Sequence, residues 1–345
     1  MNQETFYSQS KTKNILVILA ASIVIIAGIK SAAKILIPLL LSFFIAIICA
    51  PPFLWLRTKG IPKFLAILLI ILVFLIFVFL IGLLVGTSIA DFTSKLPQYQ
   101  SRLENQTQQL VEWLKTNEII EPDFKITNEI NPSSILIFVG NTLNQLSSIF
   151  TDTFLIVFNV IFILLEASTF PLKMKKILNQ STEKLRRIEV IYHKINRYIS
   201  MKTIISIITG LLVYIFLLII GLDYSLLWGV LAFALNYIPN IGSILAAVPA
   251  ILLTIIQLGV WEAVWVLVAY IIINTIMGNV IEPKFMGKGL GLSTLVVFIS
   301  LIFWGWLLGT IGMLLSIPLT IAVKIILDSS DETKWLGILL GPEKD

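Results

Sequence analysis

A short polar sequence, NYIPNIGS (236–243), interrupts an uncharged and mostly apolar run that extends over residues 226–258. Asn236 and Asn240 each carry a side-chain amide that can donate and accept hydrogen bonds. Pro239 lacks an amide hydrogen and frees carbonyl groups one turn earlier, and Gly242 lets another backbone approach closely. At membrane depth such free backbone is tolerated only where protein or water satisfies it. The sequence therefore predicts a polar cavity wall or a tight helix contact, and a simple turn between two spans is the alternative.

Two acidic residues are candidates for ion or proton coupling. Glu166 falls inside an apolar segment near its expected cytoplasmic end, and Glu282 ends another apolar segment that also contains Asn279. An ionisable residue inside the membrane is by default a hypothesis about function, because its burial is costly. The alternative for Glu282 is a helix-end acid with Lys284 nearby. The candidate pathway residues are therefore Asn279, Glu282 and Glu166, in addition to those in the polar sequence.

Enzyme chemistry has little support in the sequence. His193 is the only histidine and Cys49 the only cysteine, which argues against a histidine-based metal cluster and excludes a disulfide within the chain. The sequence contains no Walker, HExxH or CxxC motif. We therefore expect no catalytic residues, no metal and no cofactor, and no ATP-driven pumping by this chain alone.

The composition predicts a membrane protein. Hydrophobic residues make up 57% of the chain and charged residues only 13%, whereas about a quarter of a typical soluble domain is charged. The net charge of +5 resides in a few loops, as expected for positive-inside topology. Residues 173–202 carry nine Lys or Arg against two Glu and repeat apolar residues at helical spacing. We interpret this segment as an amphipathic helix on cytoplasmic lipid headgroups, with membrane lipid rather than nucleic acid as its partner.

The expected fold is all-α, with about eight spans and a small extracytoplasmic helical insertion. Five regions are predicted: spans 1–3 (1–90), the extracytoplasmic subdomain (91–150), span four with the basic helix (151–202), a C-terminal transport region (203–327) and a cytoplasmic tail (328–345). Placing both termini and the loops 57–63, 173–202 and 278–292 inside, with Lys324 just before the C-terminal tail, collects 19 of the 25 Lys and Arg on the cytoplasmic side. Lys30 and Lys34 are exceptions that can extend to the interface.

Two long apolar runs, 225–258 and 293–327, predict broken helical hairpins. Each run would form about 51 Å of straight helix, which is too long for one crossing. Both contain a Trp-Gly pair, then Ile-Gly, then Pro. With the expected topology they start from opposite sides, as do the elements that form midplane sites in inverted-repeat transporters. The second hairpin would supply the wall opposite the polar sequence, through Gly305, Gly309, Gly312 and Pro318.

Four motifs resemble the autoinducer-2 exporter family, also called PerM-type permeases. They are RTKGIPKFLAILL (57–69), NYIPNIGSILAAVPA (236–250), GNVIEPKFMGKGLGL (278–292) and WGWLLGTIGMLLSIPLT (304–320). The family often has an aromatic residue in place of Asn240, Pro in place of Ser243, and a His-Pro pair where Ser293 and Thr294 stand here. The resemblance implies a bacterial cytoplasmic membrane protein, homo-oligomers and an elevator-like movement of the hairpins.

The resemblance and the residues together predict a secondary transporter that exports a small polar solute such as autoinducer-2, driven by a proton or sodium gradient. A sodium or lithium/proton antiporter is the first alternative, because some similar proteins look like such antiporters and the candidate acids fit that role. A membrane scaffold that transports nothing and a passive channel are also compatible with the sequence. The expected partners are a small polar solute or monovalent cation, lipid, and further copies of the chain.

Overall fold

The computed structural model describes residues 20–21, 23–117, 137, 139–141, 153–167, 182–239, 241–286, 291–328 and 332–342. These residues are helical apart from short turns and include no strand, which confirms the all-α class. The principal helices are α2 (Ala33–Thr58), α3 (Lys63–Thr116), α5 (Thr153–Ala167), α7 (Thr182–Ile220), α8 (Ser225–Leu235), α9 (Gly242–Gln257), α10 (Val260–Asn274), the π-helix η2 (Thr275–Ile281), α11 (Glu282–Met286), α12 (Thr294–Asp328) and α13 (Lys334–Leu339).

Several helices have the length and apolarity to cross a membrane. Five described segments qualify: Ala33–Thr58, Lys63–Trp113, Lys194–Ile220, Val260–Lys284 and Thr294–Asp328. Three shorter apolar helices accompany them, at Thr153–Glu166, Ser225–Leu235 and Gly242–Gln257. Large apolar side chains on the long helices are exposed, as expected for surfaces that face lipid. The fold is that of a polytopic membrane protein, although residues 15–19 and 22 of the first predicted span (15–33) lie outside the described residues.

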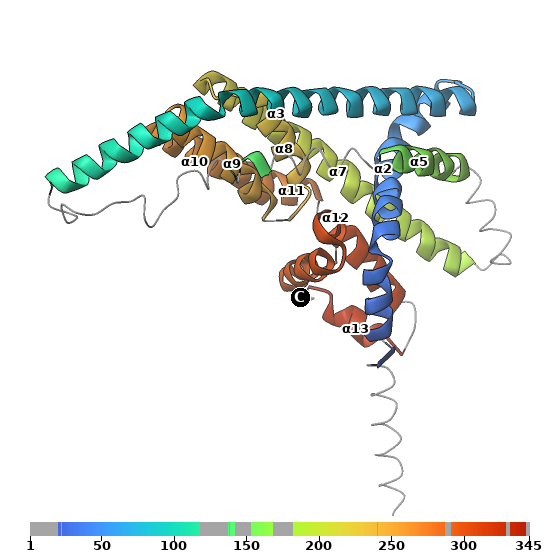
Figure 1. Cartoon of the computed structure of the whole chain (residues 1–345). Coiled ribbons are helices and arrows are strands. Elements are labelled where there is room, and N and C mark those ends of the chain that lie inside the picture. The colour runs from blue at the N-terminus through green and yellow to red at the C-terminus, as the bar shows by residue number, and fades with distance from the viewer. Residues whose placement is uncertain are drawn as a thin grey trace, which may run out of the picture.

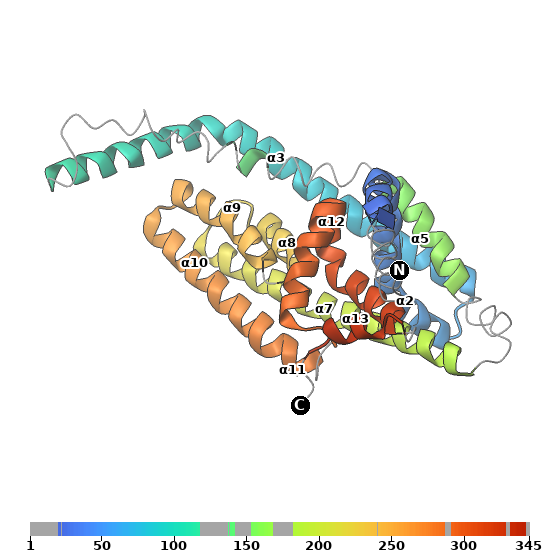
Figure 2. The same cartoon turned by 90° about the horizontal axis from the view of Figure 1, so that it is seen from below.

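Helix α3 is far longer than one bilayer crossing. Its 54 residues form a helix of about 80 Å, and it extends past α8, α9 and α10 (Figures 1 and 2). Pro97 lies inside it without ending it. The division predicted at residue 90 is therefore not a helix end, and the polar part from Asp91 onward belongs to the same continuous helix as the apolar part. Most of the predicted subdomain beyond residue 117 lies outside the described residues.

Helix α7 joins two segments that the sequence analysis separated. The basic segment and the following span form one helix from Thr182 to Ile220. The predicted division at residue 202 falls inside this helix, so the basic segment follows the helix axis of the span. Residues 173–181 of the predicted basic helix lie outside the described part of the chain.

The first predicted hairpin consists of α8 and α9, separated by the turn at 236–241. Its two ends are held together, because the Asp223 amide donates to Gln257 Oε1 at 2.9 Å and Gln257 Nε2 donates to the Gly221 carbonyl at 3.1 Å. With 11 residues, α8 is about 16 Å long, roughly half the thickness of a hydrocarbon core. The hairpin therefore starts and returns on one side.

The second predicted hairpin is α12, which folds back on itself. Gly309 has φ 65° and ψ −151°, a backbone conformation that is essentially restricted to glycine. Trp304 Nε1 donates to Thr320 Oγ1 at 3.0 Å, whereas these residues would be about 24 Å apart along a straight helix. Gly309 is thus the apex between two antiparallel arms.

The two hairpins have their open ends on opposite sides of the molecule. Asp223, at the first open end, lies 3.1 Å from Lys95 on the polar part of α3. From there α10 and η2 lead to Glu282, which contacts Lys202. Ile220, the last residue of α7, lies three residues before Asp223. Lys202 is 18 residues earlier on the same helix, about 27 Å from Ile220, so the Lys202–Glu282 contact is far from the first open end. The second hairpin begins shortly after Glu282, so the predicted opposite orientation agrees with the structure.

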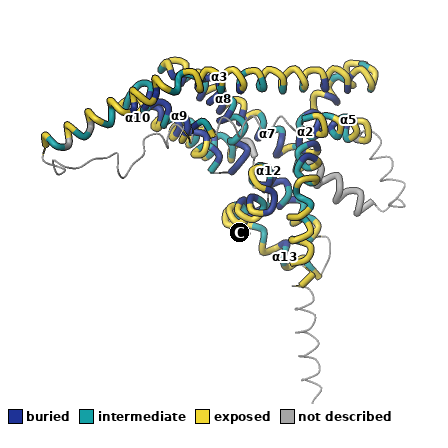
Figure 3. Tube along the Cα trace, in the orientation of Figure 1, coloured by how far each residue is buried: buried dark blue, intermediate teal, exposed yellow. Residues whose placement is uncertain are grey.

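Buried residues concentrate where α7, α8, α9 and α10 meet, while α3 is exposed along most of its length (Figure 3). A second apolar cluster joins the two hairpins: it contains Tyr237 of the first together with Leu315 and Ile317 of the second. Helix α7 contacts both α8 and α12. It is therefore the element against which both hairpins are positioned.

Candidate functional site

Glycines allow both hairpins to close tightly. A side chain at Gly242 would clash with the carbonyl oxygen of Leu235 in the preceding arm, and one at Gly312 would clash with the carbonyl oxygen of Trp304. In both hairpins a glycine at a corresponding position thus allows close backbone contact between the two arms. The Ile-Gly pairs in the sequence indicate these positions. Gly242 and Gly312 were both predicted as site residues, and their structural role is close backbone contact.

Helices α7 and α8 also pack closely through glycine. A Cβ atom at Gly210 would lie 2.7 Å from the Gly229 carbonyl oxygen, and one at Gly229 would lie 2.7 Å from Tyr214 Cβ. Small residues let helix backbones approach in membrane proteins. This contact holds the first hairpin directly against α7.

One face of α7 carries four buried polar residues, Tyr198, Lys202, Ser206 and Thr209, which we call the polar stripe. Their spacings of four, four and three residues place them on the same side of the helix. Each is at most 4% exposed, and together they extend over about 16 Å of a membrane-spanning helix. Buried polar groups are costly unless they are hydrogen-bonded, so the partners of the stripe define the site.

Lys202 forms an ion pair with Glu282. Lys202 Nζ lies 2.7 Å from Glu282 Oε2, with the side chains 5% and 18% exposed. The cation beside Glu282 thus comes from α7, 80 residues earlier, rather than from the neighbour Lys284. The adjacent Tyr198 hydroxyl is buried and has no hydrogen-bond partner among the described residues. The pair therefore links the polar stripe to the junction between η2 and α11.

The turn of the first hairpin docks on the next part of the stripe. Asn236 is 7% exposed, and its Nδ2 donates to Ser206 Oγ at 2.9 Å. The Tyr237 hydroxyl donates to Thr203 Oγ1 at 2.7 Å. Pro239 is buried, while Asn240 lies outside the described residues. The predicted polar contact is thus present at Asn236, and the described part of the turn is packed inside the protein.

The remaining predicted residues divide into two groups. Gly305, Gly312 and Pro318 are buried within the second hairpin, whereas Gly309 is exposed at its apex. Asn279 is exposed on η2. Glu166 is exposed at the end of α5, which packs against α2 and α3. The structure does not bring Glu166 together with Glu282.

Sequence reasoning missed Lys202 and Ser206. Lys202 was counted with the basic segment, yet it is followed by a long uncharged run. The spacing of Tyr198, Lys202, Ser206 and Thr209 on one helical face was the available signal. The described residues contain no group of three or more His, Cys, Asp or Glu that could hold a metal ion.

The ion pair, the docked hairpin and the opposite hairpin orientations are features of a polytopic membrane protein. A model of AI-2E family transporters matches residues 15–331. The chain belongs to the AI-2E transporter family. This confirms the resemblance carried by the four sequence motifs.

Three relatives align with the AI-2E chain over nearly its whole length. The "AI-2 transport protein TqsA" of Escherichia coli K12 is 39% identical over 326 residues, covering 94% of this chain and 95% of TqsA. A Haemophilus influenzae protein named "Putative transport protein" is 42% identical over 340 residues, covering 95% and 96%. The E. coli K12 protein YhhT, also named as a transport protein, is 35% identical over 330 residues, covering 95% and 94%. All three names describe transport rather than catalysis.

Proposed function

We propose that this protein is a secondary transporter that exports a small polar solute, with autoinducer-2 as the first candidate. The observation that carries the proposal is the polar stripe, which places buried polar groups along a membrane-spanning helix and against a re-entrant hairpin. Such groups are costly in lipid and mark substrate or ion pathways. The name of the relative TqsA supports autoinducer-2 as the solute.

The Lys202–Glu282 pair supplies a means of coupling to an ion gradient. Separating two buried charges is costly unless another group replaces the lost partner. A proton or sodium ion that binds Glu282 neutralises the carboxylate and weakens its hold on Lys202. Helix α7 and the η2–α11 junction can then separate, and the adjacent hairpin is free to move. Solute passage and ion binding would thus depend on the same pair.

A sodium or lithium/proton antiporter is the second candidate, and Glu282 is the observation that favours it. Antiport needs a carboxylate that binds either a proton or a metal ion and is accessible from each side of the membrane in turn. In that case Glu282 would carry the transported ion, and no organic solute would be needed.

Transport by purified protein in liposomes tests both candidates. We expect an imposed pH gradient to drive autoinducer-2 transport through coupled proton movement, with the rate reduced at least tenfold in Glu282→Gln. Asp223→Asn is the matched control, because it breaks an ion pair on the polar side of α3 and should retain transport. If sodium or lithium collapses the gradient without autoinducer-2 movement, the protein is an antiporter. If normally folded protein moves neither, both candidates are wrong.

The charge distribution supports placement in the bacterial cytoplasmic membrane with both termini in the cytoplasm. In this arrangement Lys202 and Glu282 lie toward the cytoplasmic side, and Asp223 lies toward the outside. We also propose a homo-oligomer, as the resemblance implies. Mass measurement of the detergent-solubilised protein by light scattering tests this, and a monomer mass would contradict it.

A further inference from the structure

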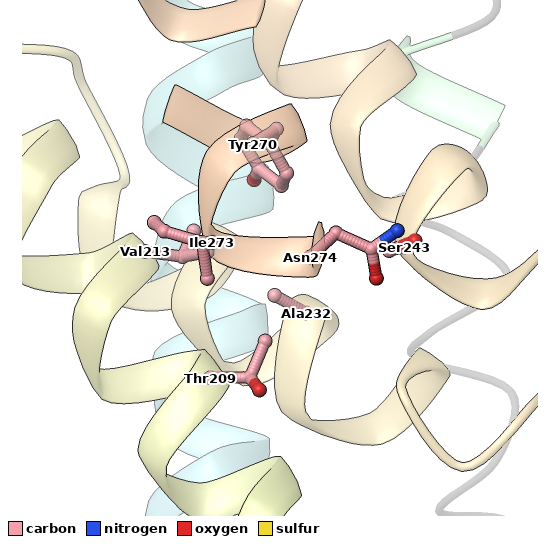
Figure 4. A pocket seen from close by; sticks show the side chains of 7 residues that line it. All are labelled: Thr209, Val213, Ala232, Ser243, Tyr270, Ile273 and Asn274. Atoms are coloured by element: carbon pink, nitrogen blue, oxygen red, sulfur yellow. The ribbon is translucent and has the colours of Figure 1, made fainter. Parts of the chain in front are cut away.

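A small cavity lies where α7, α8, α9 and α10 meet, next to the polar stripe. It is lined by Thr209, Val213, Ala232, Ser243, Tyr270, Ile273 and Asn274 (Figure 4). It holds about 220 Å³ of empty space including its open mouth, with room for about one water molecule. Thr209 is the last member of the stripe, and Ser243 lies at the start of α9. The cavity thus adjoins the turn of the first hairpin.

Three polar side chains at this cavity donate no hydrogen bond to the part of the chain that the structure describes. The Tyr270 hydroxyl is buried, with the residue 6% exposed, and has no partner there. Asn274 and Ser243 likewise donate no side-chain hydrogen bond to the described residues, and in Figure 4 the Asn274 amide points toward Ser243. Leaving a buried hydroxyl without a hydrogen-bond partner costs free energy. A molecule in the cavity, either water or a ligand, can supply the missing partner.

The lining indicates which kind of ligand fits. The accessible lining is almost entirely apolar and includes Val213, Ala232 and Ile273, while Ser243, Tyr270 and Asn274 add a few hydroxyl and amide atoms; none of the described lining residues is charged. Sites for small organic molecules are mostly apolar, with a few polar groups that fix the orientation. A bare cation here would lack a carboxylate, and burying an unpaired charge is costly. The chemistry therefore favours an uncharged solute with hydroxyl groups on one side and C–H groups on the other.

We propose that this cavity is the subsite that receives a hydroxyl-bearing end of an uncharged solute. Tyr270, Asn274 and Ser243 hydrogen-bond the hydroxyl, and the apolar residues contact its carbon skeleton. This inference rests on the proposed export function and specifies the class of solute. Since the closed cavity holds about one water molecule, the solute enters when the hairpin carrying Ser243 moves away from α10, which carries Tyr270 and Asn274.

The test measures equilibrium binding of labelled autoinducer-2 to the purified full-length protein in nanodiscs. We expect Tyr270→Phe to weaken binding about tenfold, since it removes one hydrogen bond to a buried group. Asn274→Asp should also weaken binding, because it replaces an amide donor with a charge. The matched control is Thr254→Val: Thr254 is a buried residue on α9 whose hydroxyl donates to the Ala250 carbonyl and does not line the cavity. Melting temperatures establish that each variant is folded.

Competition separates the classes of ligand. Ribose, an uncharged sugar, should displace autoinducer-2, whereas ribonate, a carboxylate of similar size, should not. Displacement of autoinducer-2 from the wild type by sodium would show a cation site and overturn the proposal. Unchanged affinity in both Tyr270→Phe and Asn274→Asp would also overturn it, while leaving export intact. If the wild type neither binds nor transports autoinducer-2, the proposed function itself fails.

Discussion

At the scale of single residues, Lys202 shows how one charge can connect two distant parts of the chain. Its ammonium group is nearly inaccessible, yet it has a carboxylate partner at 2.7 Å. Removing one member of such a pair leaves the other charge buried and unpaired. Replacing both by neutral groups removes that penalty. The pair therefore affects stability and transport in separable ways.

The first prediction concerns this pair. Lys202→Met should destabilise the protein by about 3 kcal/mol, and the double variant Lys202→Met/Glu282→Gln should recover most of that loss. Unfolding in detergent, followed by circular dichroism, measures both. If the ion pair couples transport, the stable double variant still fails to use the gradient. Equal instability of the single and double variants would show that the charges do not compensate each other.

The second prediction concerns Gly242. Gly242→Ala should destabilise the protein by about 1–3 kcal/mol, because the added methyl group has no space against the Leu235 carbonyl. Gly86→Ala on α3 is the control, since nothing lies within 4 Å of the added atom and alanine favours a helix. Thermal unfolding of both variants provides the comparison. Equal melting temperatures would mean that the hairpin opens at no cost.

Residue types alone indicated part of the site. Asn236 and Gly242 were predicted because a polar or flexible residue within a long apolar run needs a structural role. In the structure Asn236 hydrogen-bonds to Ser206, and Gly242 lets the backbone lie against the Leu235 carbonyl. Lys202 was missed because its own neighbours in sequence are basic on one side and apolar on the other. Its partner is 80 residues away, and no local pattern reveals a contact at such a distance.

At the scale of elements, length predicted the hairpins but not the helix ends. A run of about 34 apolar residues exceeds one bilayer crossing and must fold back or tilt, so α8–α9 and α12 were both expected. The divisions predicted at residues 90 and 202 marked changes of polarity. No helix ends at either point, because a helix can pass from lipid into water without a break when its backbone hydrogen bonds continue.

The third prediction concerns the apex of the second hairpin. Gly309 adopts φ 65° and ψ −151°, so Gly309→Ala should cost about 1–3 kcal/mol through backbone strain alone. The cost is not steric, since nothing lies within 4 Å of the added atom. Hydrogen exchange of residues 304–320 should increase in this variant. Unchanged exchange would indicate that α12 tolerates a different bend.

At the scale of the whole molecule, α7 lies between two hairpins that open on opposite sides. The first open end is tied to the polar part of α3 through Asp223, Lys95 and Tyr99. The second is tied to α13, where the Ser293 amide donates to the Leu340 carbonyl at 3.1 Å. Each hairpin is therefore fixed at its base, while its turn or apex lies inside or across the membrane region. In the proposed transporter, this arrangement would let the two sides open alternately around the polar stripe.

The last prediction tests this arrangement by labelling from one side. In a Cys49→Ser background, which removes the only cysteine, Asn105→Cys marks the polar part of α3 and Lys334→Cys marks α13; both residues are exposed. A membrane-impermeant maleimide applied to spheroplasts should label Asn105→Cys alone, and Lys334→Cys should react only after the membrane is opened. Labelling of both from outside would contradict the opposite orientation of the hairpins. Labelling of Lys334→Cys alone would reverse the topology, and Lys202 and Glu282 would then close the external side of the transporter.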